Sequence, residues 1–224
     1  MKTNALNRRE FLASAATTGA VLSAGLAPST TVTAASVVSG AVDCQSHLFL
    51  QPVIDLMRRR KKDPLVYDEG GTTFLEMGEW FRKIPPHYLS VETKLAAMDN
   101  AGIAITMLST NDPGPEWFGE DGPEVARVIH DAIAAVVAAH PTRFRGLCVL
   151  PFQNEAAAME ELDRCVKLGF KGILLYTNLA SEWCDEPQFR WVFGRAAELG
   201  MPILLHPAKP MTTEQEKGYP LTST

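Results

Sequence analysis

The sequence predicts an α/β protein built around parallel strands. Three observations predict this class: short, almost continuously apolar runs recur along the chain, segments of helical periodicity separate them, and Gly or Pro marks most boundaries. Strands that are apolar on both faces are typical of parallel sheets covered by helices. Right-handed β/α/β connections build either a closed barrel or an open flavodoxin-like sheet from such units. The five apolar runs are residues 41–49, 103–109, 144–150, 171–177 and 202–206.

Local capping signals place the helices between these strands. Ser90 and Asn154 can accept the free N–H groups of a helix's first turn, so each predicts a helix start. Pro123 opens the longest helix and Pro141 stops it. Two β-prone runs around the Gly-Gly pair at 70–71 predict a hairpin inside an otherwise irregular excursion. The predicted helices are residues 52–61, 91–100, 123–140, 155–168 and 187–199.

Composition limits the classes of partner. The 224 residues carry a formal net charge of −5 and are 46% hydrophobic, which is typical of a soluble globular chain with one sizeable core. The acidic balance argues against nucleic acid, because phosphate binding needs a basic surface. The cysteines have no C-x-x-C spacing, so no zinc knuckle or thioredoxin-like site is indicated. We expect Cys44, Cys148 and Cys165 to be buried thiols because their neighbours are apolar.

The first 34 residues predict a twin-arginine export signal. Residues 7–13 read NRREFLA, a small-residue apolar run follows, and a Ser/Thr/Ala segment offers cleavage near Ala34. The apolar run is short and rich in Ala, Thr and Gly, which makes it weak as a spanning helix, although an uncleaved anchor is the alternative. We therefore expect an exported protein, periplasmic or otherwise extracytoplasmic, with no stable membrane span after cleavage.

Two of the apolar runs carry a histidine at or near their carboxyl end, His47 and His206. The carboxyl ends of parallel strands meet at one mouth, so these imidazoles are expected to lie together. Gln45 alternates with His47 along the first run and projects to the same face. Neutral imidazole is a ligand for divalent metals. A single histidine at a strand end more often caps a buried strand, but the pairing favours a metal site.

Four stretches carry a resemblance to a known family. They are VDCQSHLF at 42–49, AAHPTRFRGLCVLPFQNEAAAMEELDRCVK at 138–167, LGFKGILLYTN at 168–178 and DEPQFRWVFGRAAELGMPILLHP at 185–207. The chain resembles the amidohydrolase-related enzymes that include aminocarboxymuconate semialdehyde decarboxylase and the resorcylate-type decarboxylases. The resemblance implies an eight-stranded (β/α) TIM barrel with one catalytic divalent ion, zinc or manganese.

The resemblance also implies where the site residues lie. Its metal ligands come from the first, fifth and eighth strands, and its proton-transfer histidine comes from the sixth. The sequence has only about the first five β/α units, so residues 35–224 are expected to be the N-terminal portion of the barrel domain. The base and the aspartate ligand are then expected beyond Thr224, in a longer protein, and the 224 residues alone are expected to be inactive.

Gln45 departs from the family pattern, because it stands where the family has a leading histidine. Its carbonyl oxygen is a neutral, hard and weak ligand, which favours manganese or magnesium over zinc. The alternative is that Gln45 only hydrogen-bonds a water or a neighbour. The predicted metal ligands are therefore His47 and His206, with Gln45 as a third.

Other residues are predicted around this centre. Asp43 lies two residues before Gln45, on the same face of the predicted strand, and is expected to orient the ligands. The loops after the strands are expected to bind the substrate, with aromatic rings for stacking and Lys209 for a carboxylate. We expect the pair at 160–161 to lie on a solvated face. The predicted substrate-binding residues are Trp117, Tyr176, Asn178 and Lys209.

The resemblance leaves the reaction open between two metal-dependent chemistries on a small carboxylated or cyclic substrate. One is non-oxidative decarboxylation and the other is hydrolysis. A different class of function is an exported, non-catalytic small-molecule-binding protein on the same scaffold, which Gln45 suggests. The resemblance also implies that the full-length protein is a homodimer.

Overall fold

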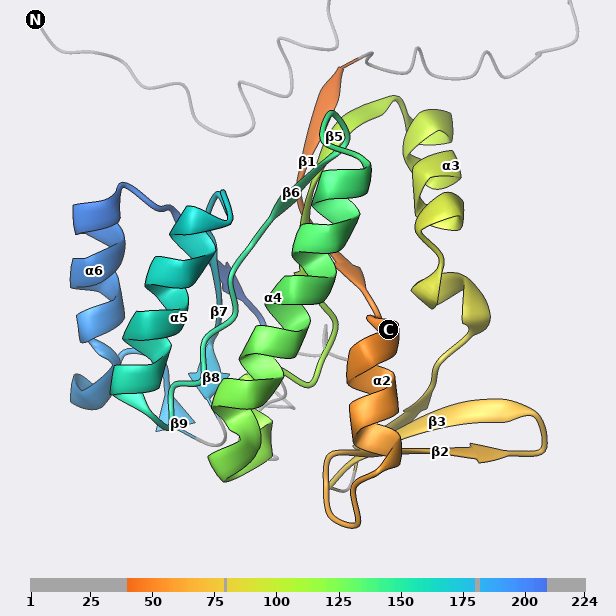
Figure 1. The fold of residues 1–224 in the computed structure, drawn as a ribbon, viewed down its shortest axis with the longest axis horizontal. Coiled ribbons are helices and arrows are strands. Elements are labelled where there is room, and N and C mark those ends of the chain that lie inside the picture. Colours follow the sequence, from red (N-terminus) through yellow and green to blue (C-terminus); the bar gives the residue numbers. More distant parts are fainter. Residues whose placement is uncertain (1–39, 79, 180–181, 209–224) are drawn as a thin grey trace, which may run out of the picture. The chain divides into compact units, whose positions relative to one another are not determined.

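Five parallel strands run side by side in the order in which they occur along the chain (Figure 1). The computed structural model describes residues 40–78, 80–179 and 182–208, so the predicted export signal and Lys209 lie outside the described residues. The third and fourth strands are joined by a parallel bridge between Cys148 and Ile173. The strands are β1 (Ala41–Leu48), β5 (Ile103–Thr110), β6 (Phe144–Gly146), β7 (Ile173–Tyr176) and β10 (Ile203–His206).

This strand order decides between the two architectures that the sequence leaves open. In a flavodoxin-like sheet the first strand lies inside the sheet, between the second and third. Here β1 pairs with β5 alone among the described strands, and the order is sequential, as in a β/α barrel. The prediction of a TIM-barrel α/β chain with about five β/α units is confirmed.

The parallel strands are strongly curved. Four steps of about 4.8 Å separate β1 from β10, which would place them about 19 Å apart in a flat sheet. Yet the Nε2 atoms of His47 and His206, at the ends of these two strands, are 3.0 Å apart. The strands therefore follow an arc whose concave side brings their carboxyl ends together.

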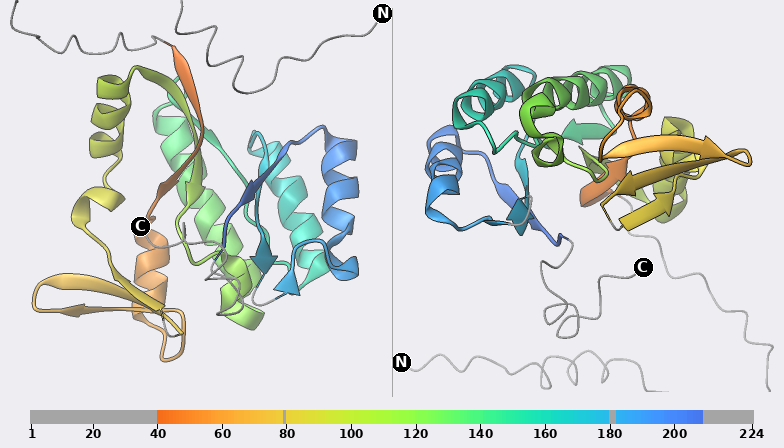
Figure 2. Two further views of the ribbon diagram at one scale, coloured as in Figure 1. Left: turned by 180° about the vertical axis from the view of Figure 1, so that it is seen from behind. Right: turned by 90° about the horizontal axis from the view of Figure 1, so that it is seen from below.

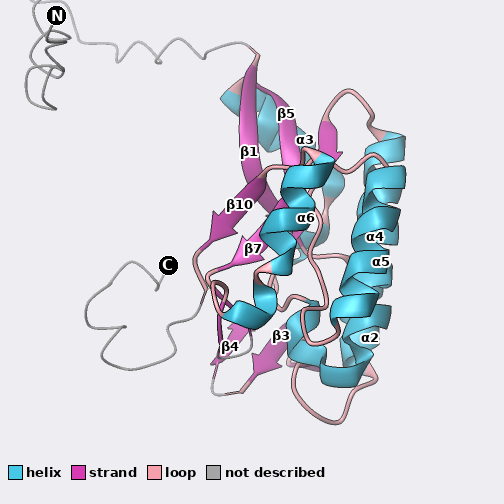
Figure 3. Cartoon of the chain, turned by 90° about the vertical axis from the view of Figure 1, so that its left-hand side faces the viewer, coloured by secondary structure: helices cyan, strands magenta, loops and turns pink. Residues whose placement is uncertain are grey.

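Helices cover the convex side of this arc. Figure 3 shows α4, α5 and α6 on one side of the strands, and Figure 2 shows the same arrangement from below. The predicted caps are confirmed, because Ser90 Oγ accepts the N–H of Thr93 and Asn154 Oδ1 accepts that of Ala157, both at 3.0 Å. The helices are α2 (Gln51–Arg58), α3 (Val91–Ala101), α4 (Gly122–Ala139), α5 (Glu155–Lys167) and α6 (Trp191–Leu199).

The excursion after α2 is an antiparallel extension beside the parallel strands (Figure 1). The predicted hairpin is β2 (Leu65–Glu69) and β3 (Thr72–Met77), and its two turn glycines both have positive φ. A third strand that the sequence did not predict, β4 (Trp80–Lys83), pairs with β3. This strand places Arg82 beside the first parallel strand's carboxyl end, where the arginine lines a cavity with His47.

Several details differ from the predictions. The helix predicted at 187–199 is split into η3 (Pro187–Phe189) and α6. Cys44 is exposed, whereas Cys148 and Cys165 are buried as predicted. The Cys44 prediction is wrong because side chains alternate along β1: Asp43 and Gln45 are partly buried on one face, and Cys44 lies on the opposite, exposed face. The remaining short elements are η1 (Pro86–Leu89), η2 (Pro115–Asp121), β8 (Asn178–Leu179) and β9 (Glu182–Trp183).

The core lies between the helices and the parallel strands. Its fully buried side chains come from both layers and include Leu108, Ile129, Phe144, Leu162 and Val192. None of the helices in the described part of the chain is both long enough and apolar enough to cross a membrane.

Candidate metal and substrate site

Hydrogen bonding fixes which nitrogen of His47 is available to a metal. Nδ1 lies 2.7 Å from the carbonyl oxygen of Thr110, at the end of the neighbouring strand β5. A carbonyl oxygen only accepts hydrogen bonds, so Nδ1 carries the proton and Nε2 carries the lone pair. Burial is the main reason that the pKa of His47 falls to about 4; the hydrogen bond to Thr110 opposes this fall, and the positive charges of Lys94 and Arg82 add to it. The ring is therefore neutral at pH 7, which is the form that binds metal.

His206 is oriented in the same way. Its Nδ1 lies 2.6 Å from the carbonyl oxygen of Pro207, so this nitrogen is also the donor and Nε2 again carries the lone pair. Its ring packs edge-on against His47, with 4.8 Å between the centroids. The structure therefore brings together the two histidines that the sequence selects, although they lie on the first and fifth strands.

The two lone pairs face each other. The Nε2 atoms of His47 and His206 are 3.0 Å apart, and neither nitrogen has a proton to share. Two acceptors at this distance repel each other unless a cation lies between or beside them. Two ligand atoms about 2.1 Å from one ion would be about 3.0 Å apart at a right angle and about 3.4 Å apart at the tetrahedral angle. The donor set and its spacing therefore fit a divalent metal with near-octahedral angles.

Gln45 lies beside these nitrogens. Its Nε2 atom is 3.0 Å from His47 Nε2 and 3.3 Å from the hydroxyl of Ser109. In this orientation the amide donates to the histidine lone pair. Because the amide oxygen and nitrogen are similar in size, a half-turn about the last side-chain bond exchanges them. The side chain is therefore placed to supply an oxygen ligand in one orientation and a hydrogen bond in the other.

Asp43 supports the strand rather than the histidines. One carboxylate oxygen accepts the backbone N–H of Gln45 at 3.2 Å, and the other accepts the hydroxyl of Thr106 at 3.3 Å. The carboxylate thus fixes the irregular part of β1 from which Gln45 projects, where the pairing with β5 shifts register.

The predicted substrate residues divide into two groups. Tyr176 is at the site, because it ends β7 directly opposite His206 and its ring lies 5.3 Å from that imidazole. Asn178 follows two residues later and is buried in the short strand β8. Trp117 is half-buried against the core and lines neither the cavity beside His47 nor the cavity beside Glu116.

A cationic cavity adjoins His47. It measures about 420 Å³ and has Arg82, Lys94 and His87 in its wall. The Arg82 guanidinium is held over two rings, 5.2 Å from the centroid of Phe49 and 5.5 Å from that of Trp80. Burial lowers the pKa of Lys94, whose Nζ donates to Ser46 Oγ at 2.5 Å. The cavity therefore offers an anionic group two positive charges next to the paired histidines.

Acidic side chains adjoin His206. Asp112 lies in the loop after β5 and interacts electrostatically with His206, Glu116 and Tyr176. Burial is the main cause of the raised pKa of Asp112 and of the pKa of about 8 at Glu116. Arg82, Asp112 and Glu116 were not predicted as site residues, because in the sequence they stand only in or beside turns and loops, with no motif that marks them.

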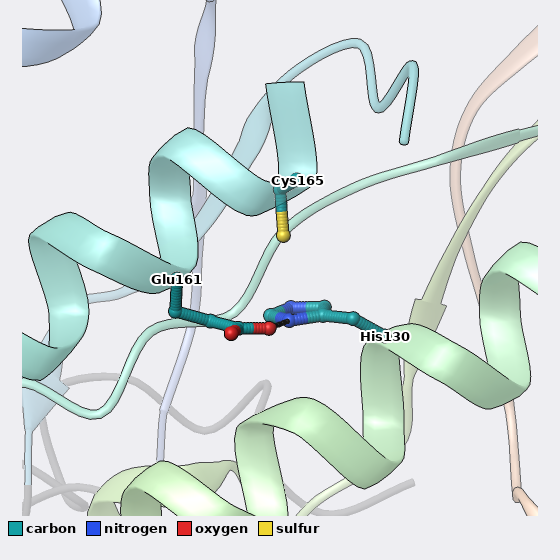
Figure 4. Close-up of side chains that lie close together, drawn as sticks. All are labelled: His130, Glu161 and Cys165. Atoms are coloured by element: carbon teal, nitrogen blue, oxygen red, sulfur yellow. Dashed lines mark hydrogen bonds and ion pairs between the residues drawn. The ribbon is translucent and has the colours of Figure 1, made fainter. Parts of the chain in front are cut away.

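A second group of side chains that can ligate a metal lies between α4 and α5, away from the carboxyl ends of the parallel strands. His130, Glu161 and Cys165 offer a nitrogen, an oxygen and a sulfur within 4.8 Å of one another (Figure 4). His130 Nδ1 donates to Glu161 at 2.6 Å, and its Nε2 accepts the backbone N–H of Val149 at 3.1 Å. Both ring nitrogens are therefore occupied, so the group fits a buried structural network better than a metal site.

Glu161 is the charged centre of this network and corrects the prediction of a solvated pair at 160–161. Its side chain is only 2% exposed, whereas that of Glu160 is 76% exposed. Burial by itself would raise the pKa of Glu161, but hydrogen bonds from His130 and Arg164 outweigh it and lower the pKa to about 2. The prediction failed because the pairing partner, His130, is 31 positions away in the sequence.

Comparisons with known proteins place these features in a family. The family model for amidohydrolases matches residues 42–220. Gamma-resorcylate decarboxylase of Rhizobium sp. (strain MTP-10005) is 33% identical over 156 residues, which are 64% of this chain and 47% of the relative. The 2-amino-3-carboxymuconate-6-semialdehyde decarboxylase of Dictyostelium discoideum is 31% identical over 136 residues, or 58% of this chain and 37% of the relative.

A solved structure agrees in fold. The dihydroxybenzoic acid decarboxylase of Polaromonas sp. JS666, with bound manganese and the inhibitor 2-nitroresorcinol, superposes with a TM-score of 0.59 at 25% identity. The match covers 82% of this chain and 53% of that one. The chain thus spans about half the length of the curated relatives and of this structure.

Proposed function

The chain belongs to the amidohydrolase family, and from this premise we propose that the protein is a metal-dependent decarboxylase of small aromatic carboxylates. The observation that carries the proposal is the pair of facing Nε2 lone pairs, 3.0 Å apart, on His47 and His206. The relatives named above support decarboxylation over hydrolysis, because all three are decarboxylases by name and the third was solved with an aromatic inhibitor.

His47 and His206 would hold the metal, and Gln45 would add an oxygen after its amide turns. Manganese is the proposed ion rather than zinc, because an amide oxygen is a hard ligand and the histidine spacing suits near-octahedral angles. Manganese in the Polaromonas structure supports this choice. A divalent cation bound here would supply positive charge that stabilises the electrons left when the carboxylate departs as carbon dioxide.

The chain's own residues would hold the substrate carboxylate. Arg82 and Lys94 present charged N–H donors to the cavity next to His47, and charge-assisted hydrogen bonds to carboxylates are the strong ones. Stacking on Phe49 and Trp80 restricts the rotamers of Arg82, so less freedom is lost on binding. Tyr176, beside His206, would limit the ring's position.

Metal content tests the proposal. We expect the purified protein to bind one manganese ion, and His47→Ala or His206→Ala to weaken this binding at least tenfold in a titration followed by calorimetry. His140→Ala, at the carboxyl end of α4, is the matched control and should bind like the wild type. Unchanged metal affinity in both site variants would contradict the proposal. Release of carbon dioxide from dihydroxybenzoates then tests the reaction.

Gln45 favours a second candidate, a binding protein without catalysis. Its amide donates to the lone pair that a metal would need. If this candidate is right, Gln45→His should change neither metal content nor carbon dioxide release. A gain in both would support the enzyme.

A further inference from the structure

A second cavity lies among the loops that follow the parallel strands. It measures about 340 Å³, and none of the described residues that line it lines the larger cavity beside His47. Its wall comes from η2, from the loop after β6 and from the short segments β8, β9 and η3 that follow β7. The decarboxylase proposed above uses none of these side chains, so the cavity is open to a separate role.

The lining of this cavity is acidic and aromatic. Three carboxyl groups line it, those of Glu116, Glu155 and Glu182, and none of the described side chains in its wall is basic. Phe152 and Phe189 contribute rings whose centroids are 5.8 Å apart, at an interplanar angle of 83°. Carboxylates and the faces of aromatic rings both attract cations. The cavity is therefore suited to a positively charged ligand and opposes an anionic one.

The most buried of these carboxyls has an oxygen without a partner. Glu116 is only 6% exposed, and its own backbone N–H can serve only one of the two carboxyl oxygens. Among the described residues, Oε1 has no hydrogen bond. Buried polar atoms in native proteins are nearly always satisfied, and an exception asks for an explanation such as a bound molecule. Glu116 thus offers the cavity an acceptor that a ligand's N–H group would satisfy.

Neighbouring residues hold this carboxyl in position. A Cβ atom at Gly114 would lie 2.7 Å from Glu116 Oε1, so the glycine leaves the space that the carboxyl occupies. Gln153 Nε2 donates to the carbonyl oxygens of Pro115 and Gly119, at 3.0 and 2.7 Å, and thereby ties η2 to the loop after β6. Both hydrogens of this amide are used, so its oxygen is left as a second acceptor in the cavity wall.

The three carboxyls are too widely spaced to share one metal ion. Two oxygens bound about 2.4 Å from the same ion are at most about 4.8 Å apart. In the part of the chain that the structure describes, the group of His130, Glu161 and Cys165 is the only one whose ligand atoms meet a 4.8 Å limit. The cation that suits this cavity is therefore an organic one.

The carboxyls also differ in depth. Glu116 is buried, whereas Glu155 and Glu182 are exposed at the surface of the protein. The rest of the wall includes two phenylalanines and a leucine that are each at most 6% exposed. A linear molecule with an ammonium group at each end matches this arrangement. One end would donate to the buried carboxyl, the alkyl chain would contact the apolar wall, and the other end would stay near the exposed carboxylates.

We propose that this cavity binds a linear aliphatic diammonium ion, with one primary ammonium group hydrogen-bonded to Glu116 and the other beside Glu155 and Glu182. The site is separate from the proposed metal and carboxylate site, because the two share no side chain. Its occupation is therefore measurable whether or not the protein is a decarboxylase.

The protonation of Glu116 gives the site a pH dependence. Burial is the main cause that raises the pKa of Glu116 to about 8; the hydrogen bond from its backbone N–H opposes this rise, and the charge of Asp112 adds to it. The other titratable groups that face it are Tyr176, Glu155 and Glu182. A bound ammonium group favours the ionised carboxylate, so affinity should rise by up to about tenfold per pH unit from pH 6 to pH 8.

Calorimetric titration of the full chain tests the proposal without requiring turnover. The ligands are linear diamines with three to six carbons, and each is compared with the monoamine and the neutral diol of the same length. We expect at least one diamine to bind with one-to-one stoichiometry at pH 8, at least tenfold more tightly than its monoamine. The diols should show no binding, because they carry no charge.

Substitution of the buried carboxyl assigns this binding to the cavity. Glu116→Gln keeps the shape and removes the charge, so it should weaken the best diamine at least tenfold at pH 8 and remove the rise in affinity from pH 6. Glu120→Gln is the matched control, because this exposed residue of η2 does not line the cavity. If Glu116→Gln does not fold, Glu155→Gln combined with Glu182→Gln decides, and should reduce diamine affinity to that of the monoamine.

Three results would each overturn the proposal. They are equal binding of diamines and monoamines by the wild type, wild-type diamine affinity in the variant that decides, and loss of diamine binding in His47→Ala, which would place the ligand at the histidine pair. Diamine binding that survives in His47→Ala, in a protein that no longer binds manganese, would support the separate cavity. Failure of the decarboxylase proposal leaves all of these measurements unchanged.

Discussion

His47 and His206 each donate Nδ1–H to a backbone carbonyl oxygen, at Thr110 and Pro207. Both carbonyls lie at strand ends, so the fold itself selects the tautomer that presents Nε2 to the mouth. The sequence identifies the two histidines because each stands at or near the carboxyl end of an apolar run. It does not reveal the tautomers, since these depend on which carbonyl of the chain happens to lie beside each ring.

The buried ion pair network leads to a prediction about acid stability. Glu161 has a pKa of about 2 in the folded protein, below the ordinary value of 4.5. Its contribution is therefore complete above pH 4.5 and is lost as the pH falls toward 2. The difference of about 2.5 pKa units corresponds to at most about 3 kcal/mol. We expect the wild type to lose about this much unfolding free energy between pH 5 and pH 2, measured by urea denaturation.

Glu161→Gln should be less stable at pH 7 and should lack this part of the acid-dependent loss. The groups that face Glu161 are His130 and Arg127 on α4 and Arg164 on its own helix. Glu160→Gln is the control, because that neighbouring carboxylate is exposed. If the unfolding free energy of Glu161→Gln fell with pH as much as that of the wild type, the ionised Glu161 carboxylate would not be the source of this stabilisation.

At the scale of single elements, one side chain, that of Asn154, caps the N-terminus of α5. Asn154 Oδ1 accepts the N–H of Ala157 at 3.0 Å, which satisfies a donor that the helix itself leaves free. Asn154→Ala should lower the unfolding free energy by about 1 kcal/mol, and Asn154→Ser should restore most of it because serine also caps. Urea denaturation at neutral pH measures both. A loss in Asn154→Ser as large as in Asn154→Ala would assign the effect to packing instead.

Local rules account for most elements and fail where tertiary contacts decide. The caps at Ser90 and Asn154 were predictable because the donor and acceptor are only three residues apart. The third strand was predicted to run to residue 150 but pairs regularly only over Phe144–Gly146. Beyond it, Leu147 and Cys148 donate isolated backbone hydrogen bonds, to Leu108 and Gly172 respectively. The strand β4 was missed because its pairing partner β3, not its own pattern, makes it a strand.

At the scale of the whole molecule, the sequence predicts which strand ends lie together at the site, but not which residues from other segments surround that site. Sequential β/α units lead to a barrel-like arc, and that arc explains why the first and fifth strands share a site. Arg82 reaches this site from the antiparallel extension, and Glu116 from a loop helix. Their positions depend on how irregular segments fold back, for which single-sequence periodicity has no signal.

The predicted export signal supplies a test at the same scale. Replacing Arg8 and Arg9 together by lysine should leave the precursor in the cytoplasm, because the twin-arginine motif is read by a receptor and not by charge alone. Cell fractionation and immunoblotting measure the distribution. Arg58→Lys with Arg59→Lys is the matched control, and export should continue. Normal export of the Arg8, Arg9 variant would show that residues 1–34 act by another route.

His47 and His206 are 159 positions apart, and this distance along the chain has a consequence for folding. Bringing such remote residues together directly would cost several kcal/mol of loop-closure entropy, about 4.5 kcal/mol from the length term. The intervening strands divide that closure into shorter steps, each stabilised by the pairing of neighbours. The two imidazoles can therefore meet only when every strand between them is in register. Metal binding at this pair would then follow the pairing of all the intervening strands, so a metal-loaded chain would be one in which these strands have already formed.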